Sequence, residues 1–328
     1  MFILFLIISG LMLYSGYYVL AILVICMYFA WTHIFDDMLI GSTSYKPKRR
    51  KLFVPYERRF FNTYQVDKKA FYDTDISYQQ YKIPKRSGGH RTLLVPNPDL
   101  KMVQQQLLQG FNAHLRKRVH KSAHAYVKGR SIKTNALQHA GNKVLIKLDI
   151  EKFFDSVNKT HLEPYLRSIS WAPKIQDRLI ELMITDRGLP QGAPTSPFVA
   201  NIILYKFDVA LLAYCVRRNY KYTRYADDIT VSLPEDDSKA IGRVIKFVEE
   251  SLQNNGFRLN KKPQKLNILR PHQAQRVCGV TINSGKPTIS RKQRRMLRSA
   301  RHYQSIGRKP SLSEQQLQGH EAFVDMIM

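Results

Sequence analysis

The sequence predicts an α+β fold built on a small sheet of the split βαβ, ferredoxin-like kind. Residues 143–150 (KVLIKLDI) form an apolar, β-branched run that is typical of a buried strand. Residues 222–232 (YTRYADDITVS) alternate polar and apolar side chains, which predicts a central hairpin. Segments with helical spacing lie between the strands, so the pattern favours an α+β assembly over a doubly wound one.

The other elements follow from local patterns along the chain. Residues 78–96 predict a second hairpin, because two strand-like pieces flank the turn residues Ser87, Gly88 and Gly89. The run RVCGVTI (276–282) predicts another strand. Helical spacing is present in seven segments, at 99–120, 131–140, 158–169, 174–185, 196–216, 237–255 and 290–306.

The N-terminal segment predicts a membrane span. Its first 32 residues contain no charged side chain. A helix of about 30 residues is about 45 Å long, and the apolar core of a bilayer is about 30 Å thick. We therefore expect residues 1–35 to cross the membrane once or to re-enter it, with a buried core helix as the alternative. The basic linker 36–56 keeps the following body in the cytoplasm by the positive-inside rule.

The body of the chain is strongly basic. The net charge is +27, from 52 Lys and Arg against 25 Asp and Glu. Residues 1–45 hold two of the acids and none of the basic residues, so the remainder carries +29. Such an excess favours a polyanionic partner, either nucleic acid or anionic lipid, over a merely soluble surface. The three cysteines are far apart, which excludes a disulfide scaffold and a zinc ribbon.

Three aspartates are candidate metal ligands. Asp149 ends the predicted buried strand, where its carboxylate costs desolvation energy unless a positive charge offsets it. Asp227 and Asp228 lie at the predicted hairpin turn, and such a pair alone is usually only turn chemistry. Acids from two strands in a basic body predict Mg²⁺, which takes a few carboxylates together with substrate phosphates.

Seven sequence blocks, in family order, give the chain a resemblance to the reverse transcriptases. They are YKIPKRSGGHR, AYVKGRSI, KLDIEKFFDSV, GLPQGAPTSPFVANIIL, YADD, NGFRLNKK and RVCGVTIN, and they cover about residues 78 to 300. Within the family, Asn135 to His139 matches the NAxxH signature of bacterial retron enzymes. The resemblance implies a right-hand polymerase with fingers (57–145), a ferredoxin-like palm (146–285) and a short helical thumb (286–328), preceded by the transmembrane helix.

The resemblance also implies roles for individual residues. Asp149, Asp227 and Asp228 would be catalytic and, with Ile150, would bind two Mg²⁺ ions. Arg91 would clamp the triphosphate together with Lys82 and Lys85. Phe154 would be a steric gate against the 2′-hydroxyl. Gln191 would contact the nucleotide from its loop, and Tyr225 would lie near the primer end. The lysine that helps pyrophosphate leave would be Lys262 or Lys265, and Asp155 would be structural.

RNA recognition is expected from two further motifs. Asn135 and His139 are four residues apart, so they share a helix face, and we expect that face to bind the cognate RNA. Val277 and Gly279 belong to the segment that resembles the retron Val-Thr-Gly triplet, although Cys278 replaces its Thr. The basic helix at 291–301 is expected to follow the nucleic-acid backbone.

The sequence therefore predicts a membrane-tethered RNA-directed DNA polymerase of retron type in the cell inner membrane. It would use dNTPs to copy a structured non-coding RNA into single-stranded DNA, leaving a branched RNA–DNA product. It would act in anti-phage defence, with either the membrane segment itself or a separate effector protein as the toxic or signalling part. One alternative is another bacterial reverse transcriptase, of the group II intron or abortive-infection type. The other is a non-catalytic, membrane-anchored RNA-binding protein, against which the intact aspartates argue.

Overall fold

The computed structural model describes residues 56–84, 88–169, 171–308 and 312–328. The predicted membrane segment 1–35, the linker up to residue 55 and Lys85 lie outside the described residues.

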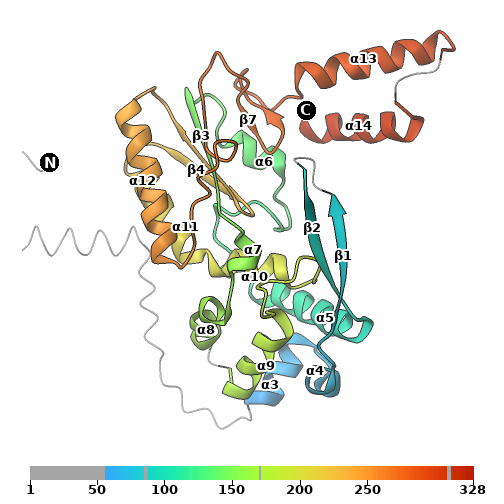
Figure 1. The fold of residues 1–328 in the computed structure, drawn as a ribbon, viewed down its shortest axis with the longest axis vertical. Coiled ribbons are helices and arrows are strands. Elements are labelled where there is room, and N and C mark those ends of the chain that lie inside the picture. The colour runs from blue at the N-terminus through green and yellow to red at the C-terminus, as the bar shows by residue number, and fades with distance from the viewer. Residues whose placement is uncertain (1–55, 85–87, 170, 309–311) are drawn as a thin grey trace, which may run out of the picture. The chain divides into compact units, whose positions relative to one another are not determined.

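A four-stranded antiparallel sheet lies at the centre of the described chain (Figure 1). Its strands are β3 (Val144–Asp149), β4 (Lys221–Tyr225), β5 (Asp228–Leu233) and β6 (Asn267–Leu269), in the order β4-β5-β3-β6. Because β3 and β4 are separated by the hairpin partner β5, this order is the split βαβ arrangement that the sequence predicts. Strands β3 and β5 are almost wholly buried, which matches their apolar sequences.

Helices surround this sheet and build one large apolar core with it. They are α3 (Tyr56–Tyr64), α4 (Lys68–Asp73), α5 (Pro98–His114), α7 (Phe153–Ser156), α8 (Lys159–Ser168), α9 (Pro173–Met183), α10 (Ser196–Ile203), α11 (Tyr205–Val216) and α12 (Ser238–Asn254). The 3₁₀ turn η1 (Arg116–Arg118) contributes no buried residue, and α6 (Ile132–Leu137) packs in a smaller, separate apolar cluster. The sequence did not indicate α3 and α4, whose aromatic residues pack around Phe60 and Phe71.

The helix predicted at 196–216 is two helices, because α10 and α11 meet at Leu204 with a bend of 49°. Among the described residues, no single helix has the length and apolarity to cross a membrane. The bent pair α10 and α11 meets that test by length and composition. Both helices also place side chains in the protein core, including Phe198, Phe207 and Leu211.

The predicted hairpin at 78–96 is present as β1 (Tyr78–Pro84) and β2 (His90–Pro96). At its tip, Gly88 and Gly89 both have positive φ angles, of 88° and 76°, which glycine adopts without steric cost. The outer part of the hairpin is exposed, whereas Pro96 at its base is buried. The hairpin therefore extends outward from the core (Figure 1).

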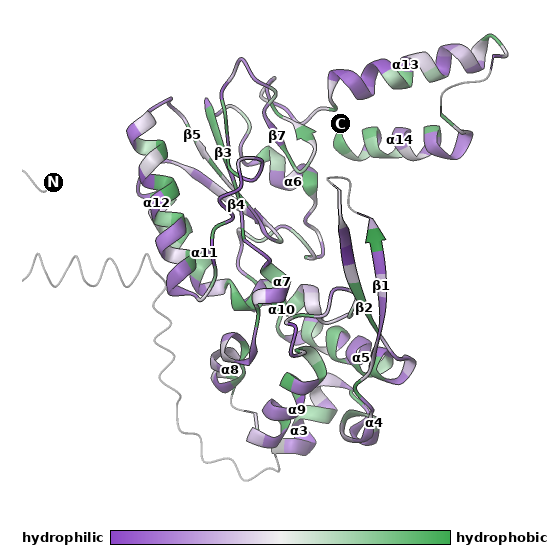
Figure 2. Ribbon diagram, in the orientation of Figure 1, coloured by the Kyte–Doolittle hydropathy of each residue, from purple (hydrophilic) through white to green (hydrophobic). Residues whose placement is uncertain are grey.

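The strand predicted at 276–282 is a small hairpin of β7 (Arg276–Val277) and β8 (Val280–Thr281). Cys278 and Gly279 both adopt positive φ, at 47° and 84°, and reverse the chain. Beyond it lie α13 (Arg291–Ser305) and α14 (Glu314–Ile327), each begun by a capping box. Most residues of α13 are hydrophilic, and many are basic, in the sequence RKQRRMLRSARHYQS (Figure 2).

Candidate active site

The three candidate carboxylates lie at one end of two neighbouring strands. Asp149 is the last residue of β3 and is directly paired with Asp228, the first residue of β5. The backbone N–H of Ile150 donates to the carbonyl of Asp227, with an N···O distance of 3.1 Å. Asp149 is buried, Asp227 is half-buried and Asp228 is exposed. The structure thus brings together the acids from the two strands, as the sequence predicts.

Two side chains hold the Asp149 carboxylate in place. Asn260 Nδ2 donates to its Oδ2 at 2.9 Å, and Lys265 Nζ donates to its Oδ1 at 2.6 Å. The hydrogen bond to Asp149 raises the pKa of Lys265, so the ammonium stays protonated. Of the two lysines left open by the sequence, Lys265 is therefore the one at the carboxylates.

The electrostatics of this cluster show an excess of negative charge. Burial, and then the carboxylates of Asp228 and Asp149, raise the pKa of Asp227 from 3.8 to about 6. Although Asp228 as a residue is exposed, partial desolvation of its carboxylate raises its pKa as well, an effect that Lys147 opposes. Lys265 is one compensating cation for this cluster.

Within the described ranges, no three His, Cys, Asp or Glu side chains are arranged to hold a metal ion. In the arrangement present, the ammonium of Lys265 engages Asp149. The donor set nevertheless fits a hard divalent cation chemically, because carboxylate oxygens are the ligands that Mg²⁺ prefers. The raised pKa of Asp227 indicates that the site favours additional positive charge.

Phe154 and the loop at 188–192 are joined through their backbones. Phe154 is half-buried in α7, and its carbonyl accepts the N–H of Leu189 at 2.8 Å. Gly188 has φ of 98°, and a Cβ there would lie 2.2 Å from the Phe154 oxygen. On the other side of the loop, the carbonyl of Gln191 accepts the N–H of Leu94 in β2 at 2.8 Å. Backbone hydrogen bonds therefore link Phe154, the predicted steric gate, to the loop that carries Gln191, and link that loop to the β1–β2 hairpin.

The predicted triphosphate clamp is only partly assembled. In the β1–β2 ladder, Arg91 is paired with Ile83, whereas Lys82 is paired with Thr92. Paired residues share a face and successive residues alternate, so Arg91 and Lys82 lie on opposite faces of the hairpin. Arg91 is close enough to act on the Tyr126 hydroxyl, which also interacts with Asp227. Arg91 therefore lies on the face of the hairpin that is nearer to Tyr126 and Asp227, and Lys82 lies on the opposite face, so the ladder does not bring the two cations together.

The structure corrects the expectation that Asn135 and His139 present a shared surface to RNA. Helix α6 ends at Leu137, so His139 lies beyond it, and both side chains are fully buried. The two ring nitrogens of His139 lie 2.8 Å from Ser232 Oγ and 2.7 Å from Thr223 Oγ1. Burial lowers the pKa of His139 to about 3, so the ring is neutral. The buried ring of His139 thus contacts both strands of the β4–β5 hairpin and links them to the segment that follows α6.

The second expected RNA contact is divided between the core and a turn. Val277 is fully buried, where it packs in a small apolar cluster with Ala136 and Leu145. Cys278 Sγ accepts a hydrogen bond from Asn135 Nδ2 at 3.3 Å, and this contact ties α6 to the β7–β8 turn. Gly279 lies in that turn, with open space where a Cβ would be. Only the turn residues remain available to a ligand.

We expect His139→Ala to act through stability and not through RNA choice. The substitution leaves a cavity and removes the partner of two buried hydroxyl groups, which costs about 2–4 kcal/mol. Extension on a generic primed template and on the cognate RNA should therefore fall in parallel, with a lower melting temperature. A selective loss on the cognate RNA at unchanged melting temperature would restore the role in recognition.

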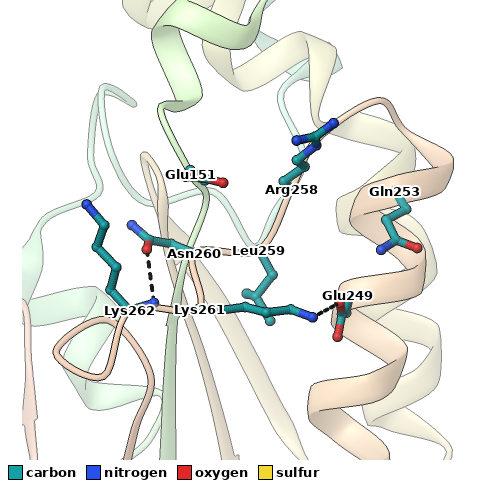
Figure 3. A pocket seen from close by; sticks show the side chains of 8 residues that line it. All are labelled: Glu151, Glu249, Gln253, Arg258, Leu259, Asn260, Lys261 and Lys262. Carbon is teal, nitrogen blue, oxygen red and sulfur yellow. Dashed lines mark hydrogen bonds and ion pairs between the residues drawn. The ribbon is translucent and has the colours of Figure 1, made fainter.

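A cavity of 660 Å³ lies beside α12, lined by residues of that helix and of the segment 258–262 (Figure 3). Asn260 lines it and also holds Asp149. Lys261 forms an ion pair with Glu249 of α12 at 2.5 Å. The remaining lining residues are Glu151, Gln253, Arg258, Leu259 and Lys262. Lys262, the other candidate for the departing pyrophosphate, thus lines this cavity.

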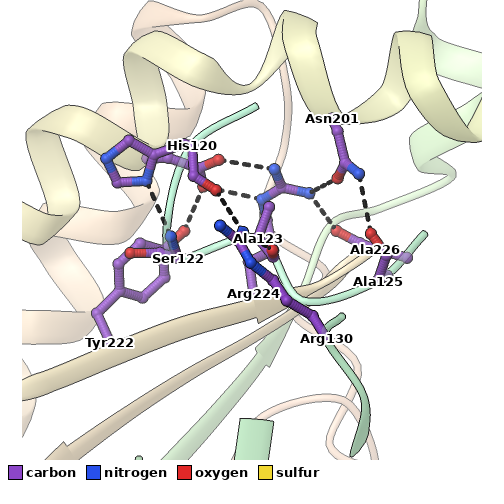
Figure 4. Close-up of polar contacts among 10 residues, drawn as sticks. His120, Ser122, Ala123, Ala125, Arg130, Asn201, Tyr222, Arg224 and Ala226 are labelled. Atoms are coloured by element: carbon purple, nitrogen blue, oxygen red, sulfur yellow. Dashed lines mark hydrogen bonds and ion pairs between the residues drawn. The ribbon is translucent and has the colours of Figure 1, made fainter. Parts of the chain in front are cut away.

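A buried ionic network that the sequence patterns did not predict supports the turn that carries Asp227 (Figure 4). Arg224 Nε and Nη2 donate to the two carboxylate oxygens of Asp208, at 2.8 and 2.7 Å, and both side chains are fully buried. Arg224 Nη1 also donates to the carbonyl of Ala226, at 3.0 Å. Tyr222 donates its hydroxyl to Asp208 at 2.6 Å. The available signal was an arginine in the predicted central hairpin, because a charge that becomes buried there requires a partner.

Comparison with known proteins agrees with this geometry. The family model for reverse transcriptase (RNA-dependent DNA polymerase) matches residues 83–290. The retron Mx162 reverse transcriptase of Myxococcus xanthus is 34% identical, over 77% of this chain and 58% of the relative. The retron Ec83 reverse transcriptase of Escherichia coli is 30% identical, over 70% of this chain and 79% of the relative. The chain thus spans less than two thirds of the Myxococcus relative.

Among solved structures, a telomerase from Candida albicans in complex with a telomeric RNA fragment has a TM-score of 0.47 at 14% identity, over 72% of this chain and 49% of that chain. The family model covers more than half of the chain, and the retron relatives match most of it. The chain therefore belongs to the reverse transcriptases, and within them to the retron group.

Proposed function

We propose that the chain is an RNA-directed DNA polymerase of retron type. It would use dNTPs to copy part of a structured non-coding RNA into single-stranded DNA, with a branched RNA–DNA product. The observation that carries this proposal is the convergence of Asp149, Asp227 and Asp228 at one end of the split βαβ sheet, in a chain of this family. A non-catalytic RNA-binding role would not require three acids to be held together at an electrostatic cost.

Two Mg²⁺ ions held by Asp149, Asp227 and Asp228 would activate the 3′-hydroxyl and stabilise the leaving pyrophosphate. In this proposal Asn260 fixes the orientation of the Asp149 carboxylate. Lys265 holds its proton on Nζ and neutralises negative charge beside the acids. Arg91 provides a forked cation for the triphosphate from the hairpin. Gln191 and Tyr225 would contact the incoming nucleotide and the primer end, respectively.

Primer extension tests the proposal directly. Protein with Mg²⁺, a primed RNA template and dNTPs should yield complementary DNA, and the nucleic acid that copurifies with the protein should contain a covalent RNA–DNA branch. A group II intron or abortive-infection type would extend primers without that branch. Binding of RNA without any extension, under conditions in which a retron reverse transcriptase extends, would support the non-catalytic alternative.

We expect Phe154→Val to admit ribonucleotides. Phe154 follows the β3 carboxylate by five residues, and its backbone is fixed by Leu189 and Gly188. If its ring lies beneath the sugar, a smaller side chain relieves a clash with the 2′-hydroxyl that is worth about 1–3 kcal/mol, or about 10- to 200-fold in relative kcat/KM. Measured rNTP and dNTP ratios, together with the melting temperature, decide the role. A lower melting temperature with an unchanged ratio would make Phe154 a core residue.

We further propose that residues 1–35 tether the protein to the inner membrane, with the catalytic body in the cytoplasm. The support is the uncharged apolar run followed by a basic segment. The full-length protein should then sediment with membranes and require detergent for release. Recovery in the soluble fraction without detergent would contradict the tether. A role in anti-phage defence with a separate effector protein is proposed from the resemblance to retrons.

A further inference from the structure

Tyr126 has three unusual properties together. Its φ angle is 61°, in the left-handed region that a residue with a Cβ seldom adopts. Its side chain is 55% exposed, although it is a large aromatic residue. Among the described residues, its ring and its hydroxyl have no stacking or hydrogen-bonding partner. Strained residues of this kind persist where their surroundings hold them, and they concentrate at functional sites.

Side chains from two other positions hold the backbone that leads to Tyr126, including the carbonyl of Ala125 (Figure 4). The carbonyl of Ala125 accepts a hydrogen bond from the buried side chain of Asn201 in α10, at 2.9 Å. Arg130 Nη1 donates to the carbonyl of His120, at 2.8 Å, and to the carbonyl of Ala123. Two side chains, Asn201 from α10 and Arg130 from further along the loop, therefore fix main-chain carbonyls that all precede the strained position.

The same segment is fastened to the strand that leads to the catalytic turn. The backbone N–H of Arg224 donates to the carbonyl of Ser122, and the backbone N–H of His124 donates to the carbonyl of Arg224, both with N···O distances of 2.7 Å. Arg224 also contacts Asn201 at 3.3 Å and the carbonyl of Ala226. One network thus fixes the backbone before Tyr126 and the turn that carries Asp227.

Tyr126 lies near two charged groups and a second tyrosine of the candidate site. Its hydroxyl lies within electrostatic range of Asp227, of Tyr225 and of Arg91. Asp227 and Tyr225 belong to the palm hairpin, whereas Arg91 belongs to β2 of the outer hairpin. A triphosphate bound by Arg91 and a metal bound by Asp227 would place the nucleotide between these groups, next to the open ring.

We propose that Tyr126 contacts the incoming deoxynucleoside triphosphate and that its ring packs against the base or the sugar of that nucleotide. The inference rests on the proposed polymerase function and adds a binding residue to it. The left-handed backbone is what turns the ring outward at this point, and the Arg224–Asn201–Arg130 contacts keep it there. The role of the ring is binding and orientation, with no proton transferred.

Three substitutions separate the ring from the backbone strain. Tyr126→Ala removes the ring and keeps a Cβ in the left-handed region. Tyr126→Gly removes the ring and also relieves the strain, so it should melt higher than Tyr126→Ala. Tyr126→Phe keeps the ring without its hydroxyl. If the ring binds the nucleotide, the alanine and glycine variants should share the same defect despite different stabilities, and the phenylalanine variant should recover most of the loss.

The readouts are the KM for each dNTP, kcat, the Kd for the primed template and the melting temperature. We expect the alanine and glycine variants to raise the KM for dNTP about 5- to 100-fold, as loss of a base–aromatic contact does. The Kd for the primed template should not change. An unchanged KM in both variants, or a raised Kd for the template at unchanged KM, would overturn the assignment. Absence of extension by the unsubstituted protein would instead overturn the polymerase function itself.

Discussion

Asp227→Asn is expected to abolish DNA synthesis and at the same time to stabilise the metal-free protein at neutral pH. The carboxylate is one of three that would hold the metal ions, and their charge stabilisation is worth several kcal/mol, so kcat should fall by more than about 100-fold. Burial and the carboxylates of Asp228 and Asp149 raise the pKa of Asp227 to about 6. The neutral amide removes both the cost of burying a charge and the repulsion from the two neighbouring carboxylates.

The sign of the pH dependence follows from linkage. The folded protein binds the Asp227 proton more tightly than the unfolded chain, in which the pKa is near 3.8. The ionised group therefore destabilises the fold above about pH 6, and this penalty disappears as the pH falls toward 4. At pH 7.5 the substitution should raise the free energy of unfolding by up to about 3 kcal/mol, and at pH 4 it should have little effect.

Melting in the presence of EDTA, at both pH values, measures the stability effect, and primer extension measures the activity. Asp155→Asn serves as a control, because Asp155 is a nearby acid that the sequence predicts to be structural and not a metal ligand. A variant that retains near-normal extension would remove Asp227 from the catalytic set. Loss of both activity and stability would show that the carboxylate supports the fold.

Arg224→Met is expected to cause the largest loss of stability. The guanidinium is fully buried and makes two hydrogen bonds to Asp208, so its removal leaves an unpaired buried carboxylate. Breaking such a pair on one side costs about 3–5 kcal/mol. In a domain of this size the melting temperature should fall by about 10 °C. Extension should fall as well, because the contact with the Ala226 carbonyl is lost.

A double variant distinguishes the unpaired charge from lost packing. Arg224→Met combined with Asp208→Leu removes both charges, and it should be more stable than Arg224→Met alone. Arg167→Met breaks a helix-surface ion pair with Glu163 and should change the stability by less than about 1 kcal/mol. Equal melting temperatures for the Arg224 single and double variants would show that the cost arises from shape and not from charge.

The sequence predicted those features that local patterns encode. The two hairpins at 78–96 and 222–232 and the buried strand ending at Asp149 are confirmed. Apolar periodicity also located α8, α9 and α12 to within a few residues. The convergence of Asp149 with Asp228 joins strands that are distant in the chain, and it was predicted from the chemistry of acids in a basic body and from the family resemblance.

The rest depended on partners that are distant in sequence. Asn135 and His139 have the spacing of a surface helix face, but their partners Cys278, Thr223 and Ser232 are supplied by other elements. The strand predicted at 276–282 is a hairpin, because two positive φ angles reverse the chain there. Likewise Lys82 and Arg91 were grouped by their charge, whereas the hairpin register separates them.

The two glycines of the loop at 188–192 have a consequence for how this enzyme can diversify. A Cβ at Gly188 would meet the Phe154 carbonyl at 2.2 Å, and a Cβ at Gly192 would meet the Leu94 carbonyl at 2.8 Å. Both obstacles are backbone atoms, and both positions have positive φ. By contrast, Gly88 has open space around it. In a saturation library selected for polymerase activity, positions 188 and 192 should therefore retain glycine alone, whereas position 88 should accept asparagine and other residues that tolerate its backbone.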